Sequence, residues 1–71
     1  SNQDFRVYSF LISAMNKETK ICSSKQMTIS RSIGMSRTAI YRCIKHLKKL
    51  KLIDVDRKYN NNNYHILKSN N

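Results

Sequence analysis

A chain of 71 residues has room for one small domain, because so short a chain buries only about 60% of the surface that it exposes when unfolded. Its 14 Lys and Arg against 4 Asp and Glu give a formal charge of +10, which implies a polyanionic partner such as nucleic acid or an anionic membrane surface. The longest apolar runs, such as residues 10–12, are far too short to cross a bilayer, so a membrane-spanning protein is excluded.

The two cysteines, Cys22 and Cys43, lie far apart and form neither a CxxC motif nor a zinc-ligand set. We therefore expect a reduced, cytoplasmic chain, with a disulfide between them as the less favoured alternative. The chain begins with Ser1 and Asn2 rather than Met, which is typical of a cloning remnant and of a fragment of a longer protein. We expect residues 1–71 to form a single domain with flexible ends at 1–3 and 68–71.

The segment DFRVYSFLISAMNK, residues 4–17, predicts a first helix, with Asp4 as an acidic cap and apolar residues such as Val7 and Leu11 at helical spacing. The following residues break the pattern, and ICSS, residues 21–24, predicts a single extended segment. Ser24 is expected to cap a second helix formed by KQMTISRSI, residues 25–33. That helix would place Gln26, Ile29, Ser30 and Ile33 on one face.

Gly34 is the only glycine in a chain without proline, and it ends the second helix. A helix that stops and lets another start at a steep angle needs a residue with positive φ, which glycine adopts without steric cost. Ser36 then caps a third helix, the clearest in the chain. Its inward face is predicted to hold Ile40, Cys43, Ile44, Leu47 and Leu50.

After Leu52 the apolar period changes to two, since Ile53 and Val55 alternate with aspartates. RKYNNNN, residues 57–63, and YHILK, residues 64–68, follow, so we predict a β-hairpin with the asparagines at its tip. A disordered low-complexity linker is the alternative for the asparagine tract, and the flanking alternation favours the hairpin. A two-stranded hairpin alone is marginal, so it must pack on the helices.

The segment TISRSIGMSRTAIYRCI, residues 28–44, resembles the helix-turn-helix family. The matching positions are Ile29, Ile33, Gly34, Met35, Ile40 and Cys43. Ser30 departs from the pattern, because the family usually has Ala there, and its hydroxyl is expected to bond back to the helix.

The wider segments 5–24 and 45–59 resemble winged helix-turn-helix modules of GntR or MarR type, and those of firmicute phage and plasmid replication proteins most of all. The resemblance implies a mainly α (α+β) fold, a three-helix winged helix-turn-helix with a C-terminal β-hairpin wing. It implies double-stranded DNA as the partner and a bacterial cytoplasmic, nucleoid-associated protein. The role would be that of a transcriptional regulator or of an initiator of mobile-element replication. Tight binding would need a homodimer or a further domain of the full-length protein, and no cofactor is expected.

On a helical wheel, the outward face of the third helix is basic and free of acidic residues. Residues near the start of such a helix reach base edges in the major groove, and later ones meet phosphates. We predict base or near-base contacts for Ser36, Arg37, Thr38, Tyr41 and Arg42, and phosphate contacts for Lys45 and Lys49. Arg37 and Arg42 are the expected guanine readers.

Further phosphate contacts are predicted at the start of the second helix, from Lys25 and Gln26, and on the wing, from Arg57 and Lys58. Each assignment has an alternative. Lys49, with its lysine neighbours, could simply favour the negative end of the helix dipole, and Tyr41 could pack on the domain edge. Arg57 and Lys58 could instead discourage edge pairing of the strand.

Other chemistries have little support in the sequence. The four acidic residues are scattered, Cys43 and His46 lack a second pair of metal ligands, and no phosphate-binding glycine loop is present, so we expect neither a metal site nor an enzyme. A protein-interaction winged helix remains the main alternative to DNA binding. Structured RNA, left-handed DNA and a membrane surface are weaker ones.

Overall fold

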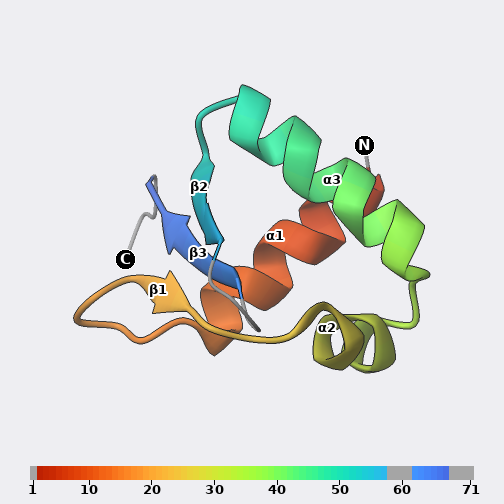
Figure 1. Ribbon diagram of the computed structural model, residues 1–71, viewed down its shortest axis with the longest axis horizontal. Coiled ribbons are helices and arrows are strands. Elements are labelled where there is room, and N and C mark those ends of the chain that lie inside the picture. Colours follow the sequence, from red (N-terminus) through yellow and green to blue (C-terminus); the bar gives the residue numbers. More distant parts are fainter. Residues whose placement is uncertain (1, 58–61, 68–71) are drawn as a thin grey trace.

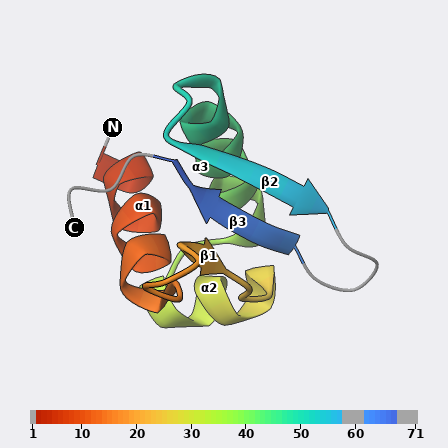
Figure 2. The same ribbon diagram turned by 90° about the vertical axis from the view of Figure 1, so that its left-hand side faces the viewer.

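A computed structural model describes residues 2–57 and 62–67. Three helices and three short strands make up this part of the chain (Figure 1). In order they are α1 (Asn2–Ala14), β1 (Ile21–Cys22), α2 (Gln26–Ile33), α3 (Arg37–Lys49), β2 (Ile53–Arg57) and β3 (Asn62–Ile66). The predicted mainly α fold with a C-terminal hairpin is confirmed. The β2–β3 hairpin extends beyond α3 in the view of Figure 2.

The strands of the described residues form one antiparallel sheet in the order β1-β3-β2. The segment that we expected to be merely extended is therefore a strand, with Cys22 opposite Tyr64. It satisfies backbone groups along the edge of β3 that β2 leaves unpaired, which a two-stranded hairpin could not do. A side-chain bond reinforces this edge, where the Ser23 hydroxyl donates to Asn63 Oδ1 at 2.8 Å.

The placement of the whole asparagine tract at the hairpin tip was wrong. Asn62 and Asn63 belong to β3 and pair with Arg57 and Asp56 of β2. Pairing with β2 and the Ser23 hydrogen bond to Asn63 supply the stability that asparagine itself does not bring to a strand. The rest of the predicted tip, with Lys58, lies outside the described residues.

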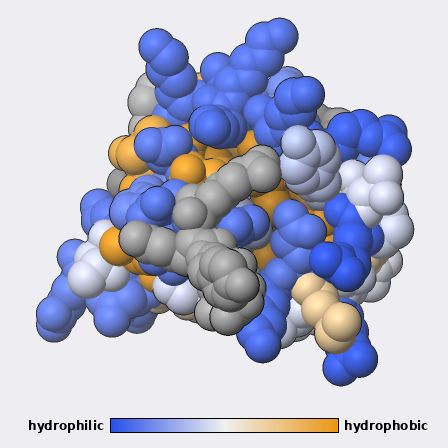
Figure 3. Space-filling model, viewed as in Figure 1, coloured by the Kyte–Doolittle hydropathy of each residue, from blue (hydrophilic) through white to orange (hydrophobic). Residues whose placement is uncertain are grey.

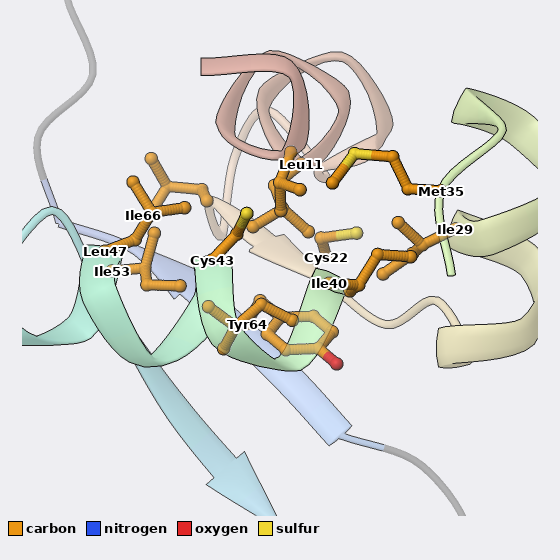
Figure 4. Close-up of a cluster of buried hydrophobic side chains, with 12 residues drawn as sticks. Leu11, Cys22, Ile29, Met35, Ile40, Cys43, Leu47, Ile53, Tyr64 and Ile66 are labelled. Atoms are coloured by element: carbon orange, nitrogen blue, oxygen red, sulfur yellow. The ribbon is translucent and has the colours of Figure 1, made fainter. Parts of the chain in front are cut away.

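Every helix and strand contributes to one apolar core (Figure 4). Tyr64 of β3 is its largest fully buried side chain, and its hydroxyl accepts a hydrogen bond from Asn62 Nδ2 at 3.4 Å. Cys22 and Cys43 are both buried and free, so the alternative of a disulfide is not realised. The core holds the three helices against the sheet and thereby fixes the orientation of α3.

Two predicted helix starts were wrong. Helix α1 begins at Asn2, so Asp4 lies in its first turn rather than at its cap. Helix α2 is capped by Lys25, whose side chain makes no capping hydrogen bond. Ser24 does not serve because the helix begins at Gln26, one residue later than predicted, and the Ser24 hydroxyl accepts from the Cys22 thiol at 3.4 Å.

The turn between α2 and α3 is built around Gly34, which has φ 66° and ψ 39°, as predicted. Its N–H donates to the Ser30 carbonyl at 2.9 Å. The Ser30 hydroxyl donates forward to the Met35 carbonyl, rather than back to its own helix as expected. From α1, Arg6 donates to the Ile33 carbonyl. The turn is therefore tied from both sides, and α3 leaves it in a fixed direction.

Leu50 was wrongly predicted to face the core, since its side chain is 51% exposed. Helix α3 ends at Lys49, and Lys51 takes a positive φ of 62°. The N–H groups of Lys51 and Leu52 then bond back to the carbonyls of Lys48 and Leu47, both near 3 Å, which is the Schellman ending of a helix. The chain turns here, so Leu52 packs against the core in place of Leu50.

Candidate nucleic-acid interface

Helix α3 starts where its sequence predicts. Ser36 has extended backbone, and its side-chain oxygen accepts from the Ala39 N–H at 3.1 Å. This cap satisfies one of the free N–H groups at the start of the helix. Its hydroxyl proton remains free to rotate toward another acceptor.

The outward side of α3 is exposed and basic. We call it the recognition face and define it as Arg37, Thr38, Tyr41, Arg42, Lys45 and Lys49, all of which are exposed. The opposite side of the helix, from Ile40 to Leu47, is buried in the core. Helix α3 contains no acidic residue. In Figure 3 hydrophilic side chains project from the upper part of the molecule, where α3 lies.

Tyr41 belongs to this face but also borders the hairpin. Its side chain is 47% exposed, so part of it packs at the domain edge and the rest is open to solvent. It lines a recess of about 160 Å³ with Gln26, Lys45 and Lys48. Val55 and Asn62 of the hairpin form the other wall. The fold thus brings together predicted residues from α2 and α3, and it adds Lys48 and Asn62, which we had not predicted.

The start of α2 lies at one edge of this surface. Lys25 is exposed at the cap, and Gln26 is half-buried. Because no side chain caps α2, its first N–H groups point out of the helix toward whatever approaches its N-terminus. On the hairpin, Arg57 ends β2 opposite Asn62. The Arg57 side chain and all of Lys58 lie outside the part of the chain that the structure describes.

On the other side of α3, the start of α1 makes a polar contact that we had not predicted. The Nδ1 atom of His46 is hydrogen-bonded to Oδ2 of Asp4. The His46 side chain is 49% exposed and that of Asp4 only 14%. The two residues are 42 positions apart, so no local pattern in the sequence could have indicated the contact.

This contact and its neighbour Cys43 set the charge state of the site. Burial acts to raise the pKa of Asp4, but the hydrogen bonds with His46 and Cys43 and the charge of His46 outweigh it, so this pKa lies below its ordinary value. Burial, followed by the bond to the Asp4 carboxylate, raises the pKa of Cys43 to about 11. Asp4 is therefore ionised and Cys43 a neutral thiol at neutral pH.

Two features are absent from the part of the chain that the structure describes. No group of three or more His, Cys, Asp or Glu side chains is placed to hold a metal ion there. None of the helices in residues 2–57 and 62–67 has the length and apolar character needed to cross a membrane.

The comparisons with known proteins agree with this geometry. The model of a family described as "Helix-turn-helix domain" matches residues 1–53. A solved structure, the AntR antimony-specific transcriptional repressor, superposes with a TM-score of 0.67 at 16% identity. The match covers 96% of this chain and 55% of the repressor chain, so this chain spans about half of that protein. No curated protein matches.

The family match includes the whole α2–Gly34–α3 unit, and the structural match extends over the hairpin. Three helices followed by a hairpin on an antiparallel sheet are the winged form of this architecture. The chain therefore belongs to the helix-turn-helix domain family and has the winged-helix fold.

Proposed function

We propose that this chain binds double-stranded DNA by inserting the recognition face of α3 into the major groove, as the DNA-binding module of a transcriptional regulator. The observation that carries the proposal is the recognition face itself, which is exposed, basic and free of acidic residues on a helix held rigidly by the core. The major groove of B-DNA is wide enough for one α-helix, and Lys and Arg side chains neutralise the phosphates of the DNA backbone.

The residues have different roles in this proposal. Arg37 and Arg42 read guanine, because a guanidinium can donate to O6 and N7 together. Ser36, Thr38 and Tyr41 lie near the base edges at the start of the helix. Phosphate contacts come from Lys45, Lys49, Lys25, Gln26, Arg57 and Lys58, which would position the module without reading sequence.

The dependence of duplex binding on salt tests this proposal. If about five phosphates are neutralised, log K should fall with log salt at a slope near −4.5. The double variant Lys45→Ala/Lys49→Ala should flatten that slope by about 1.8, since each lost phosphate contact contributes about 0.9. Fluorescence anisotropy with a labelled duplex measures both slopes.

Lys17→Ala is the control, because Lys17 is exposed in the loop between α1 and β1 and belongs to none of the predicted contact sites. It should leave the slope unchanged. A wild-type slope near zero on every duplex would contradict DNA binding and would favour an acidic partner protein instead. Flattening by about 0.9 in Lys17→Ala, the same per lysine as in the double variant, would show that binding depends on charge alone and not on the recognition face.

Transcriptional regulation is supported by the likeness to a transcriptional repressor. The replication role rests on sequence resemblance only. Selection of bound duplexes from a random pool separates the two. We expect a palindromic consensus, which fits a dimeric regulator whose second copy adds the affinity that a single module lacks. Tandem direct repeats would instead favour a replication origin.

A further inference from the structure

A second recess borders the recognition face on the side away from the hairpin. It has a volume of about 420 Å³ and lies where the start of α1 meets α3. We call it the α1–α3 recess, and its lining residues are Gln3, Asp4, Arg42, Cys43 and His46. Arg42 belongs to both the recess and the recognition face, so any DNA lying along that face passes the mouth of the recess.

The contact inside the recess determines how His46 can act. Its Nδ1 is engaged by the Asp4 carboxylate, which also accepts from the Cys43 thiol. A carboxylate only accepts, so Nδ1 carries a proton, and Nε2 is the ring nitrogen left for another partner. The Nδ1 side of the ring is held by the largely buried Asp4 carboxylate, and the His46 side chain remains 49% exposed. Histidine rings held in this way have a fixed tautomer and orientation.

We propose, on the basis of the DNA-binding function above, that protonated His46 donates its Nε2–H to a backbone phosphate of bound DNA and that Asp4 is the positioning residue for this contact. When the ring is neutral, Nε2 is an acceptor and faces a phosphate oxygen that is also an acceptor. When the ring is protonated, Nε2 is a charged donor. Binding to this phosphate therefore requires the imidazolium form.

The side chains that line the recess and its border, apart from His46, keep one charge between about pH 5.5 and 7.5. From α1 the group is Asp4, which stays ionised because its pKa is lowered. From α3 they are Cys43, whose pKa of about 11 keeps it neutral, and the cations Arg42, Lys45 and Lys49. The charge of the N-terminal amino group also acts on Asp4 and Cys43, so only the part of a change in DNA affinity that His46→Gln removes reports on the charge of His46.

The test compares wild type, His46→Gln and His65→Gln in binding to a fluorescein-labelled duplex of about 20 mixed-sequence base pairs at several salt concentrations. His65 lies on β3, opposite Asp54, and is the other histidine of the chain. Wild type should bind about fivefold more tightly at about pH 5.5 than at about pH 7.5. Its salt slope should be steeper by about 0.9 at the lower pH, as for one added phosphate contact.

His46→Gln should lose both effects, and His65→Gln should keep both. Asp4→Ala should lower the pH ratio, with circular dichroism showing that the helices remain. Asp4→Asn, which keeps an oxygen acceptor for Nδ1–H, should restore part of the pH ratio that Asp4→Ala loses. A wild-type affinity that does not change with pH, or an equal ratio in His46→Gln, would overturn the assignment while the salt slope still supported DNA binding. Absence of duplex binding at both pH values would overturn the two proposals together.

Discussion

Replacing Arg42 with alanine is expected to weaken binding to the duplex selected from a random pool by about 5- to 150-fold. A bidentate contact between Arg and guanine contributes about 1–3 kcal/mol of discrimination, which corresponds to that range. The side chain is exposed, so its removal leaves the core intact. Fluorescence anisotropy on the selected duplex measures the loss, and thermal unfolding verifies that the fold is retained.

Arg42→Lys separates base reading from charge. Lysine keeps the positive charge but cannot donate through a planar fork. We expect Arg42→Lys to bind a mixed-sequence duplex nearly as well as wild type and to lose its preference for the selected one. If Arg42→Ala bound the selected duplex with wild-type affinity, Arg42 would not be a base reader, and the protein-interaction alternative would gain support.

Replacing Gly34 with valine is expected to lower the free energy of unfolding by about 2 kcal/mol and to weaken DNA binding as well. The loss comes from the backbone, because Gly34 has φ 66° and an added Cβ would meet nothing within 4 Å. A β-branched residue can escape this strain only by moving the turn. Such a movement would rotate α3 away from the position set by the Ser30 and Arg6 hydrogen bonds.

Two further substitutions of Gly34 show whether backbone conformation or side-chain size causes the loss of stability. Asparagine is larger than alanine but adopts the left-handed conformation more readily. We therefore expect Gly34→Asn to cost less stability than Gly34→Ala, by chemical denaturation. The reverse order, with the larger side chain more damaging, would show that crowding rather than backbone conformation decides the effect.

The third helix and its turn were predictable because their signals are local. Gly34 and Ser36 mark the two sides of the turn, and the apolar residues from Ile40 to Leu47 recur at helical spacing along a buried stripe. The recognition face then follows from geometry, since whatever is opposite a buried stripe is exposed. The inward placement of Leu50 was wrong because periodicity alone does not reveal that Lys51 adopts positive φ and ends the helix.

Three of the remaining differences depend on contacts between distant parts of the chain. Ile21 and Cys22 are too few to predict a strand, and they become one only because β3 lies beside them. Pairing with β2 draws Asn62 and Asn63 into β3, although they have little strand preference of their own. Likewise, Asp4 looked like a helix cap, and only the packing of α1 on α3 brings it to His46. Tertiary structure overrode local preference at each of these sites.

DNA binding through the recognition face is tested most directly by an amide NMR titration of the isotope-labelled chain with the selected duplex. DNA binding through the recognition face predicts that the largest shifts occur in residues 36–49 and at the start of α2. Smaller changes should occur in the exposed groove between α1 and α2, which Phe5, Phe10 and Ile33 line. Shifts concentrated in that groove, with the signals of α3 unchanged, would contradict DNA binding through the recognition face.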